Sequence, residues 1–377
     1  MRSHSHPQPA GTTEDAARLG GIRREIDAID AALLDLLNRR AGCSLEAGGL
    51  KAGKGSPVFR PGREEELVQA LLDRNPGPLP DAHLRAVYRE ILSSSRALQR
   101  PLKVAYLGPE GTFSHMAAVE FFGHSMDFLP LPRFDDIFEA VANRNSDIGV
   151  VPLENSLHGT IVQSIDLFAA HSVHIQAEWF SRISHSLMSR ERDIGAITTV
   201  YSHPQALGQC ANWLRAHLPE ARLLSVDSTA AAAHKALGEA GAAAIGHGSL
   251  ASRLGLSLLA KGIEDTGNNW TRFVSIGAEA PENNGPSKTS ALFTLPDKPG
   301  TLAAVLQCFA SAKVNMNKLE SRPMRSERWK YIFFCDIACN LMDAEHAALL
   351  EKLRGRCLSF RILGAYPAGR YMETDAG

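Results

Sequence analysis

The sequence lacks the features that would assign it to several common protein classes. Its 377 residues carry 40 basic and 41 acidic side chains, so no excess charge points to nucleic acid or an anionic membrane as the main partner. No apolar run reaches transmembrane length, and residues 1–18 lack the apolar core of a signal peptide. The six cysteines contain no Cys-x-x-Cys pair, which argues against a disulfide framework and a zinc site. We therefore expect a cytoplasmic protein without a metal or other cofactor, disordered over residues 1–18.

The first module, expected over residues 19–100, has a helical pattern. Apolar residues from Ile22 to Leu37 recur at alternating spacings of four and three, which places one long stripe on a helix. Such a stripe requires another helix to cover it. The pair Gly48 and Gly49 disfavours a helix interior, so the first helix is expected to end or fray there. Two further helices, each opened at a proline, are expected before residue 100.

The second module, expected over residues 102–280, has a different period. Short β-branched runs alternate with helical stretches, which is the pattern of an α/β domain. The clearest runs begin at Lys103, Asp147, Val173 and Thr198. We expect two lobes, because a domain of this kind that grips a small polar substrate usually does so in a cleft between lobes.

The third module, expected over residues 287–367, follows a linker rich in proline, glycine and asparagine. Its order of strand, helix, strand, strand, helix, strand predicts the ferredoxin-like βαββαβ arrangement. The strands are expected at Thr289–Leu295, Val314–Ser321, Trp329–Ala338 and Leu358–Tyr366, with helices from Thr301 and Asp343. The predicted fold class is thus multidomain: an all-α domain, a two-lobed α/β domain and a ferredoxin-like domain.

The run from Gly267 to Val274 places a hydroxyl, a guanidinium and an aromatic ring side by side where a loop enters a strand. Because side chains alternate along a strand, Thr271 and Phe273 should share one face while Arg272 points to the other. This arrangement could hold an anionic ring beside a proton-donating hydroxyl. An ordinary loop-to-strand junction with a surface arginine is the alternative, and the tripeptide alone favours it.

Two upstream runs change that balance. Together with Gly108–Ser114 and Pro152–Ser156, the run from Gly267 resembles the motifs of the prephenate dehydratase family. The resemblance implies that prephenate loses its ring hydroxyl as water and its ring carboxylate as carbon dioxide, giving phenylpyruvate. It implies Thr271 as the proton donor, which must act through a polarising neighbour because a free threonine hydroxyl is a very weak acid.

The resemblance also implies the residues that surround the substrate. Candidates to bind or polarise it are Glu154, Asn155, Ser202, Gln209, Asn268, Arg272 and Phe273, with Arg272 neutralising a carboxylate. The backbone amides at Thr112 and Ser114 are expected to approach an anion at a helix N-terminus. His158 is interpreted as a structural histidine with satisfied hydrogen bonds rather than as a pH-sensing residue.

The helical module resembles the all-helical chorismate mutases fused to bacterial dehydratases. The matching runs are Ile22–Asp30, Asn38–Arg40, Lys51, Arg63-Glu64 and Tyr88–Ile91. The resemblance implies that Arg23 and Arg40 clamp carboxylates of chorismate, that Arg63 and Ser95 line the site, and that Lys51 and Gln99 reach the ether oxygen. Glu64, if it faces that oxygen, must be protonated or hydrogen-bonded.

A pericyclic rearrangement needs only a compressed substrate and cations placed where negative charge grows, which these residues could supply. In this family one helix commonly crosses into the partner subunit, so Arg40 is expected to serve the neighbouring site. The long apolar stripe fits a homodimer or a dimer of dimers.

The third module resembles the ACT regulatory domains attached to these dehydratases. The runs Asp297–Leu302 and Leu319–Pro323 match their phenylalanine-binding motifs. Phenylalanine is therefore the expected effector, since a glycine turn at a helix start offers free amides to its carboxylate. The implied effector-binding residues are Gly300, Thr301, Leu302, Glu320, Ser321, Arg322 and Pro323.

The three resemblances predict a bifunctional enzyme of phenylalanine biosynthesis that is feedback-inhibited by phenylalanine. One alternative is a dehydratase that prefers arogenate and whose mutase module only dimerises. A second is a non-catalytic amino-acid sensor. Retention of Thr271, Asn155 and the cationic set of the helical module counts against the sensor, which would need none of them.

Overall fold

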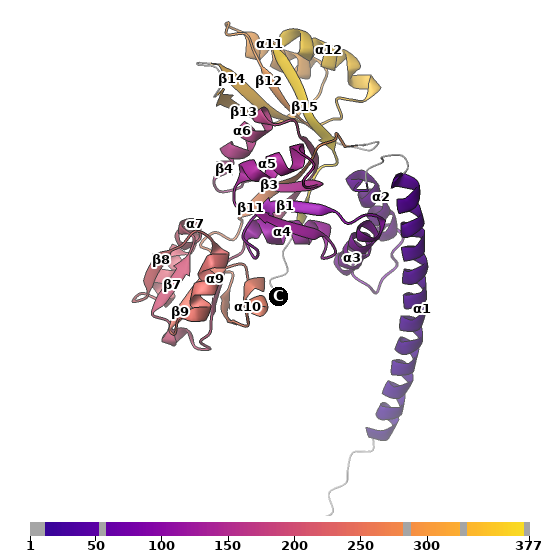
Figure 1. Ribbon diagram of the computed structural model, residues 1–377, viewed down its shortest axis with the longest axis vertical. Coiled ribbons are helices and arrows are strands. Elements are labelled where there is room, and N and C mark those ends of the chain that lie inside the picture. The colour runs from indigo at the N-terminus through magenta and orange to yellow at the C-terminus, as the bar shows by residue number, and fades with distance from the viewer. Residues whose placement is uncertain (1–11, 53–57, 282–287, 325–329, 373–377) are drawn as a thin grey trace, which may run out of the picture. The chain divides into compact units, whose positions relative to one another are not determined.

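The computed structural model describes residues 12–52, 58–281, 288–324 and 330–372 (Figure 1). Of the expected disordered segment, residues 1–11 lie outside the described residues, and residues 12–18 are helical, so the expectation of disorder is wrong for them. The expected linker lies largely on residues 282–287, which are also outside the described residues. The chain divides into two compact units, Met1–Val58 with Ser95–Arg100, and Phe59–Ser94 with Pro101–Gly377. Among the described residues, none of the helices combines the length and the apolar character that crossing a membrane requires.

The first helix, α1 (Thr12–Ala52), is unbroken through Gly48 and Gly49, so the expected end at these glycines is wrong. Gly48 is buried, and a Cβ atom there would lie only 2.8 Å from the Cα atom of Gln99. The close approach of two backbones therefore explains this glycine, and the packing offsets the helix propensity that glycine costs, about 1 kcal/mol.

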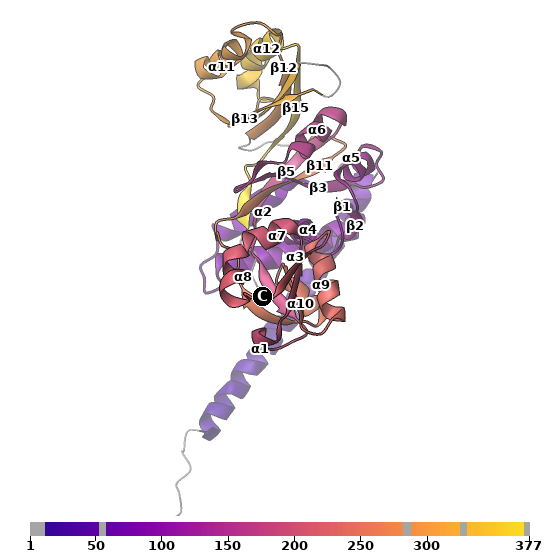
Figure 2. The same ribbon diagram turned by 90° about the vertical axis from the view of Figure 1, so that its left-hand side faces the viewer.

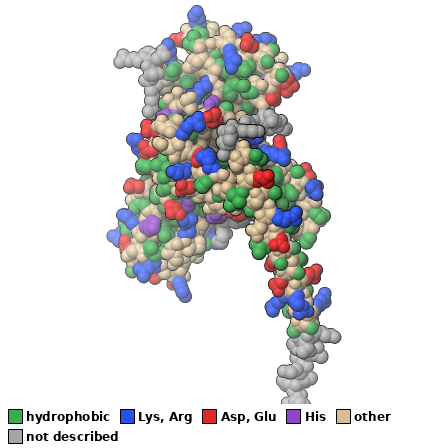
Figure 3. Space-filling view, turned by 45° about the vertical axis from the view of Figure 1, so that its right-hand side comes forward, with side chains coloured by type: hydrophobic (Ala, Val, Ile, Leu, Met, Phe, Trp, Pro, Cys, Tyr) green, Lys and Arg blue, Asp and Glu red, His purple; other side chains and the backbone are tan. Residues whose placement is uncertain are grey.

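The apolar stripe of α1 is exposed in this single chain. Its side chains from Ile22 to Leu37 are between 44% and 56% exposed, at Ile22, Ile26, Ile29, Leu33, Leu36 and Leu37. Figure 3 shows hydrophobic side chains at the surface of this helix. The two further helices are confirmed as α2 (Pro61–Leu72) and α3 (Asp81–Gln99).

The first lobe of the α/β module contains a seven-stranded mixed sheet in the order β16-β5-β11-β3-β1-β2, with β4 paired to β3. Its strands are β1 (Lys103–Leu107), β2 (Asp127–Leu131), β3 (Ile148–Asn155), β4 (Gly159–Thr160), β5 (His174–Arg182), β11 (Trp270–Gly277) and β16 (Arg370–Met372). Its helices are α4 (Phe113–Phe122), α5 (Phe134–Ala142) and α6 (Val162–Ala170). Strand β11 runs antiparallel to both β3 and β5, so it lies between them in the sheet.

The second lobe has its own five-stranded sheet in the order β10-β6-β9-β7-β8, and both lobes are visible in Figure 2. Its strands are β6 (Ser186–Ser189), β7 (Thr199–Ser202), β8 (Arg222–Ser225), β9 (Ala242–Gly246) and β10 (Ser257–Lys261). Its helices are a short 3-10 turn (Ile194–Ala196), α7 (Pro204–Gln209), α8 (Ala211–His217), α9 (Thr229–Gly238) and α10 (Ser249–Leu254). The prediction of a two-lobed α/β module is confirmed.

The third module has the predicted βαββαβ order, and its antiparallel sheet is arranged β13-β14-β12-β15. The elements are β12 (Lys288–Thr294), α11 (Thr301–Ser311), β13 (Met316–Pro323), β14 (Tyr331–Ile337), a 3-10 turn (Ala344–His346), α12 (Ala347–Arg356) and β15 (Ser359–Tyr366). The expected strand start at Trp329 lies outside the described residues.

The two faces of this sheet have different neighbours. Helices α11 and α12 cover one face, where Phe293 and Leu353 belong to one buried cluster. On the other face Leu292 and Phe334 belong to the same buried cluster as Ile175 of β5. The third module and the first lobe of the α/β module therefore share one hydrophobic core, and their contact is fixed by burial rather than by a linker.

Candidate active site

Thr271 and Asn155 face each other across neighbouring strands, in register on β11 and β3. The Asn155 Nδ2 atom donates to the Thr271 Oγ1 atom at 3.0 Å, and both side chains are buried. The Asn155 Oδ1 atom accepts from the backbone amides of Leu157 and His158, which fixes the orientation of its amide group. Thr271 therefore accepts a hydrogen bond on its oxygen and keeps its own proton for another acceptor.

The loop before β11 holds this pair in place. The Asn269 Oδ1 atom accepts from Asn155 Nδ2 at 2.8 Å, although sequence reasoning did not select Asn269. Asn269 is only 1% exposed, and its place in the run of two asparagines before Trp270 was the available signal. Asn268 accepts from the Ser156 hydroxyl through its backbone oxygen at 3.1 Å and from the Trp270 indole through Oδ1 at 2.9 Å.

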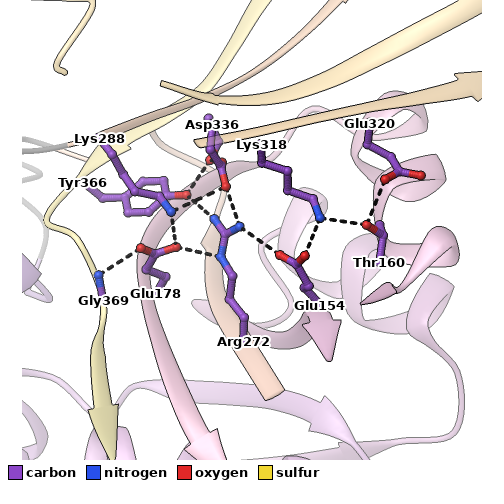
Figure 4. Close-up of polar contacts among 11 residues, drawn as sticks. Glu154, Thr160, Glu178, Arg272, Lys288, Lys318, Glu320, Asp336, Tyr366 and Gly369 are labelled. Atoms are coloured by element: carbon purple, nitrogen blue, oxygen red, sulfur yellow. Dashed lines mark hydrogen bonds and ion pairs between the residues drawn. The ribbon is translucent and has the colours of Figure 1, made fainter. Parts of the chain in front are cut away.

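Arg272 points to the opposite face of β11 from Thr271, as the strand alternation predicts. Its Nε atom donates to Glu178 Oε2 at 2.7 Å and its Nη1 atom donates to Asp336 Oδ2 at 2.5 Å (Figure 4). Glu178 belongs to β5 and Asp336 to β14 of the third module, and all three side chains are buried. The structure thus places Arg272 between two modules, paired with two carboxylates.

A further cation and a hydroxyl complete this buried cluster. Lys288 Nζ lies 2.7 Å from Glu178 Oε2, and the Tyr366 hydroxyl accepts from Arg272 at 3.2 Å. Burial alone raises the pKa of Asp336, but the charges of Arg272 and Lys288 outweigh burial and lower that pKa. The carboxylate therefore stays ionised inside the protein.

Glu154 also lies on the side of Arg272 rather than that of Thr271. Lys318 of β13 donates from Nζ to Glu154 Oε1 at 2.7 Å and to the Thr160 hydroxyl at 2.7 Å (Figure 4). The Thr160 hydroxyl in turn donates to Glu320 Oε2 at 3.1 Å. We call the set Glu154, Glu178, Arg272, Lys288, Lys318, Asp336 and Tyr366 the interdomain network.

The turn before α4 brings the two lobes into contact. Thr112 caps this helix, since its Oγ1 atom accepts from the His115 amide, while its own amide donates to Pro109 O at 3.4 Å. The next residue, Phe113, lies edge-on to His185 and His247 of the second lobe, at 5.2 and 5.8 Å between ring centroids. Ser114 is buried in the first turn of α4.

Neither of these histidines was selected from the sequence, and both are buried. Burial lowers the pKa of His185, and it lowers the pKa of His247 to about 4, so both imidazoles are neutral at ordinary pH.

The remaining dehydratase candidates have diverse surroundings. Ser202 is fully buried, and its hydroxyl donates to the backbone oxygen of Ile245 at 2.7 Å. Phe273 is a core residue stacked on Trp179. The side chain of Gln209, in contrast, lies between the imidazoles of His158 and His185.

The helical module brings together four of its candidates within one unit. Arg40 of α1 donates to the Ser95 hydroxyl of α3, and Lys51 Nζ donates to Gln99 Oε1 at 2.9 Å. Arg23 cannot join them in the same chain, because 28 residues of straight helix separate it from Lys51, or about 42 Å at the α-helical rise.

Arg40 is thus paired with α3 of its own chain, and Arg23 stands apart from both pairs. Arg63 and Glu64 lie in the first turn of α2, where Arg63 pairs with Glu66 at 3.3 Å.

The effector candidates divide between the two faces of the third module. Gly300 adopts a left-handed conformation with φ of 84° at the start of α11, which only glycine adopts without strain. The Thr301 hydroxyl donates to Pro296 O at 3.1 Å, and Leu302 packs against the helix-covered core. On β13, Glu320 and Arg322 alternate with Ser321 and Pro323.

Glu320 and Arg322 of β13 face the α/β module, because Glu320 contacts Thr160 and Arg322 lies 3.7 Å from Asp166 of α6. Pro323 lines a cavity of about 870 Å³ together with residues of α6 and the sheet.

Comparisons with known proteins agree with this architecture. Family models match in the order chorismate mutase type II over residues 22–100, prephenate dehydratase over residues 104–281 and ACT domain over residues 289–355. The chain is 38% identical over 359 residues to the bifunctional chorismate mutase/prephenate dehydratase of Stutzerimonas stutzeri, covering 94% of this chain and 98% of the relative. The corresponding protein of Aquifex aeolicus is 37% identical over 356 residues, covering 93% and 98%.

The solved prephenate dehydratase of Arthrobacter aurescens in complex with L-Phe is 31% identical, with a TM-score of 0.64 over 71% of this chain and 90% of that one. With all three modules matched in order and relatives aligned over nearly their whole length, the chain belongs to the bifunctional chorismate mutase/prephenate dehydratase family and carries an ACT domain.

Proposed function

We propose that the helical module rearranges chorismate to prephenate and that the α/β module converts prephenate to phenylpyruvate, water and carbon dioxide. The observation that carries the second activity is the hydrogen bond from Asn155 Nδ2 to Thr271 Oγ1. A donor aimed at this oxygen stabilises negative charge on it, which makes the threonine hydroxyl a stronger acid. Asn155 is thus the polarising neighbour that a threonine needs to act as a general acid.

The proposed dehydration breaks two bonds of prephenate in a concerted or stepwise elimination. The C–C bond to the ring carboxylate breaks, and its electron pair enters the ring as carbon dioxide leaves. The C–O bond to the ring hydroxyl breaks on the far side of the ring, and Thr271 transfers its proton to the departing oxygen, giving water. Solvent returns the proton to Thr271. Aromatisation of the ring provides the driving force.

The geometry supports Thr271, Asn155 and Asn269 as the reacting edge of this site. We assign Arg272 and Glu154 to the interdomain network instead, because both side chains lie on the other face of the sheet. A substrate carboxylate is proposed to bind at the N-terminal turn of α4, where the helix dipole favours an anion.

For the mutase we propose a homodimer in which α1 of a second copy completes each site. Arg40 pairs with Ser95 and Lys51 pairs with Gln99, both between α1 and α3, while Arg23 is about 42 Å along the helix from Lys51. An exposed apolar stripe of this length is costly in water, and a second α1 could cover it. The second copy would then bring its own Arg23 to the Arg40 and Lys51 pairs.

We further propose phenylalanine as the effector of the ACT domain, with its carboxylate at the Gly300 turn. The interdomain network supports a route for its effect, because Lys318 of β13 contacts Glu154, which adjoins Asn155 on β3. A small displacement of β13 would therefore act on the strand that orients the Thr271 hydroxyl. All six cysteines are free thiols, which supports the proposed cytoplasmic location.

One assay separates these proposals from the alternatives. Purified protein is supplied with chorismate, and prephenate and phenylpyruvate are measured separately, with and without phenylalanine. Formation of both products, suppressed by phenylalanine, is expected. Phenylpyruvate from added prephenate but none from chorismate would reduce the helical module to a dimerisation element. Faster turnover of arogenate than of prephenate would change the substrate, and binding of phenylalanine without any turnover would indicate a sensor.

A further inference from the structure

A chain of hydrogen bonds connects the two lobes of the dehydratase domain. His158, in the loop after β3, lies with its Nε2 atom 3.0 Å from Gln209 Nε2 at the end of α7. The Gln209 Oε1 atom lies 2.7 Å from His185 Nε2, between β5 and β6. The amide of one glutamine therefore links an imidazole of the first lobe to an imidazole of the second.

This bridge has a defined polarity. An amide oxygen only accepts, so His185 carries its proton on Nε2 and donates to Gln209. The amide nitrogen only donates, so His158 presents an unprotonated Nε2 to it. His185 Nδ1 is then a buried lone pair, and no partner for it is present among the described residues.

The bridge ends at the proposed proton donor. The His158 backbone amide donates to Asn155 Oδ1 at 3.1 Å, and this bond helps to aim Asn155 Nδ2 at Thr271 Oγ1. The position of the His158 loop therefore sets the orientation of the amide that polarises the threonine.

We propose that His158, Gln209 and His185 form an interlobe bridge that positions Asn155 against Thr271, and that the bridge opens when His158 takes up a proton. The inference rests on the proposed role of Thr271 in dehydration. His158 is exposed, so solvent reaches its ring. A protonated ring presents an N–H group to the amide N–H of Gln209, and two donors cannot form a hydrogen bond.

Rotation of the Gln209 amide does not rescue the bridge. The rotated amide would place Gln209 Nε2 against His185 Nε2. The His185 ring would then have to carry its proton on the buried Nδ1 atom instead of on Nε2. That atom has no acceptor beside it among the described residues, and burying an unsatisfied donor is unfavourable.

The titratable groups around the bridge do not remove this constraint. Glu264 accepts from the His185 backbone amide at 2.8 Å, Asp265 donates through its amide to Gln209 O, and His247 lies near His185. Burial lowers the pKa of His185, which therefore stays neutral.

The test measures kcat for prephenate dehydration from pH 8 to pH 5.5 in the full-length protein. The His158→Gln variant keeps an acceptor near the position of Nε2 but cannot be protonated, whereas His158→Leu removes the acceptor. His234→Gln, at an exposed histidine of α9, is the matched control.

The ratio of His158→Gln to wild-type kcat is expected to rise about fivefold to tenfold between pH 8 and pH 5.5, the factor for one lost hydrogen bond. His158→Leu should be slow at every pH, and the control should track the wild type. A ratio that stays constant in folded His158→Gln overturns the bridge. Loss of activity in Thr271→Val alongside that constant ratio would leave the role of Thr271 standing, whereas an active Thr271→Val would remove both.

Discussion

The two catalytic modules differ in how much of a site one chain can assemble. In the α/β module, sheet register brings Asn155 and Thr271 within hydrogen-bonding distance, although more than a hundred residues separate them in the sequence. In the helical module, Arg23 and Lys51 are much closer in sequence but lie about 42 Å apart, because both belong to the straight helix α1. A sheet returns on itself within one chain, whereas the two ends of one helix stay apart, so the mutase site proposed above needs a second copy.

The same difference appears in burial. Thr271 and Asn155 are almost inaccessible, while the apolar stripe of α1 is about half exposed. The dehydratase site is therefore expected to depend mainly on contacts inside the chain, and the mutase site on association.

The largest expected effect is the loss of dehydration in Thr271→Val, which keeps the shape of the side chain but removes the hydroxyl. Removal of a general acid should lower kcat for prephenate by about 10²–10⁴-fold. Mutase activity should persist, because Thr271 lies in another module. Thr271→Ser should retain much of the dehydration rate. Wild-type dehydration in Thr271→Val would show that this threonine only packs.

Lys51→Ala should produce the complementary defect. Loss of one preorganised cation at the ether oxygen is expected to lower chorismate turnover by about 10²-fold or more. Dehydration of added prephenate is the internal control and should be unchanged. A folded Lys51→Ala protein with the full mutase rate would contradict the assignment of Lys51.

Lys318→Met tests whether the ACT domain acts through the interdomain network. The change removes the charge that contacts Glu154 and should reduce the coupling between phenylalanine and dehydration by roughly 0.5–2 kcal/mol. Calorimetric affinity for phenylalanine in the absence of prephenate should change much less. Lys352→Met, at an exposed lysine of α12, is the control. Undiminished inhibition in Lys318→Met would place the route elsewhere.

A substitution tests this coupling more cleanly than removal of the whole ACT domain. Truncation would take Asp336 away from Arg272 and leave a buried guanidinium with one carboxylate fewer, besides exposing the shared core.

The smallest expected effect is a partial recovery of mutase activity when two inactive variants are mixed. It tests most directly whether two chains assemble the mutase site. A mixture of Arg23→Ala and Lys51→Ala proteins, unfolded and refolded together, should regain about a quarter of the wild-type mutase rate. Half of randomly formed pairs are mixed, and each mixed pair contains one intact site. No recovery in a mixture shown to form mixed pairs would mean that Arg23 and Lys51 do not act in one site.

Several features could be predicted before the structure was known. The spacing of apolar residues predicted the helices and strands, and the alternation of side chains along a strand correctly predicted that Thr271 and Arg272 lie on opposite faces of β11. The end expected at Gly48 was wrong because helix propensity is a local quantity, whereas the close contact with Gln99 depends on how α3 packs. Asn269 and the neutral pair His185 and His247 were missed, since burial and hydrogen-bond partners are not visible in a single sequence.

The sequence by itself determined the order of the modules, their family and which side chains share a face of each strand, because these follow from local periodicity and motif spacing. Only the tertiary structure decided what covers each face. From the sequence alone, Arg272 could attract an anionic ligand, and Glu154 and Glu320 could repel one. Packing of the ACT sheet on the dehydratase core instead places all three in contacts between two domains. The role of each of these charged side chains depends on the residue that packing places beside it, and that residue is distant in the sequence.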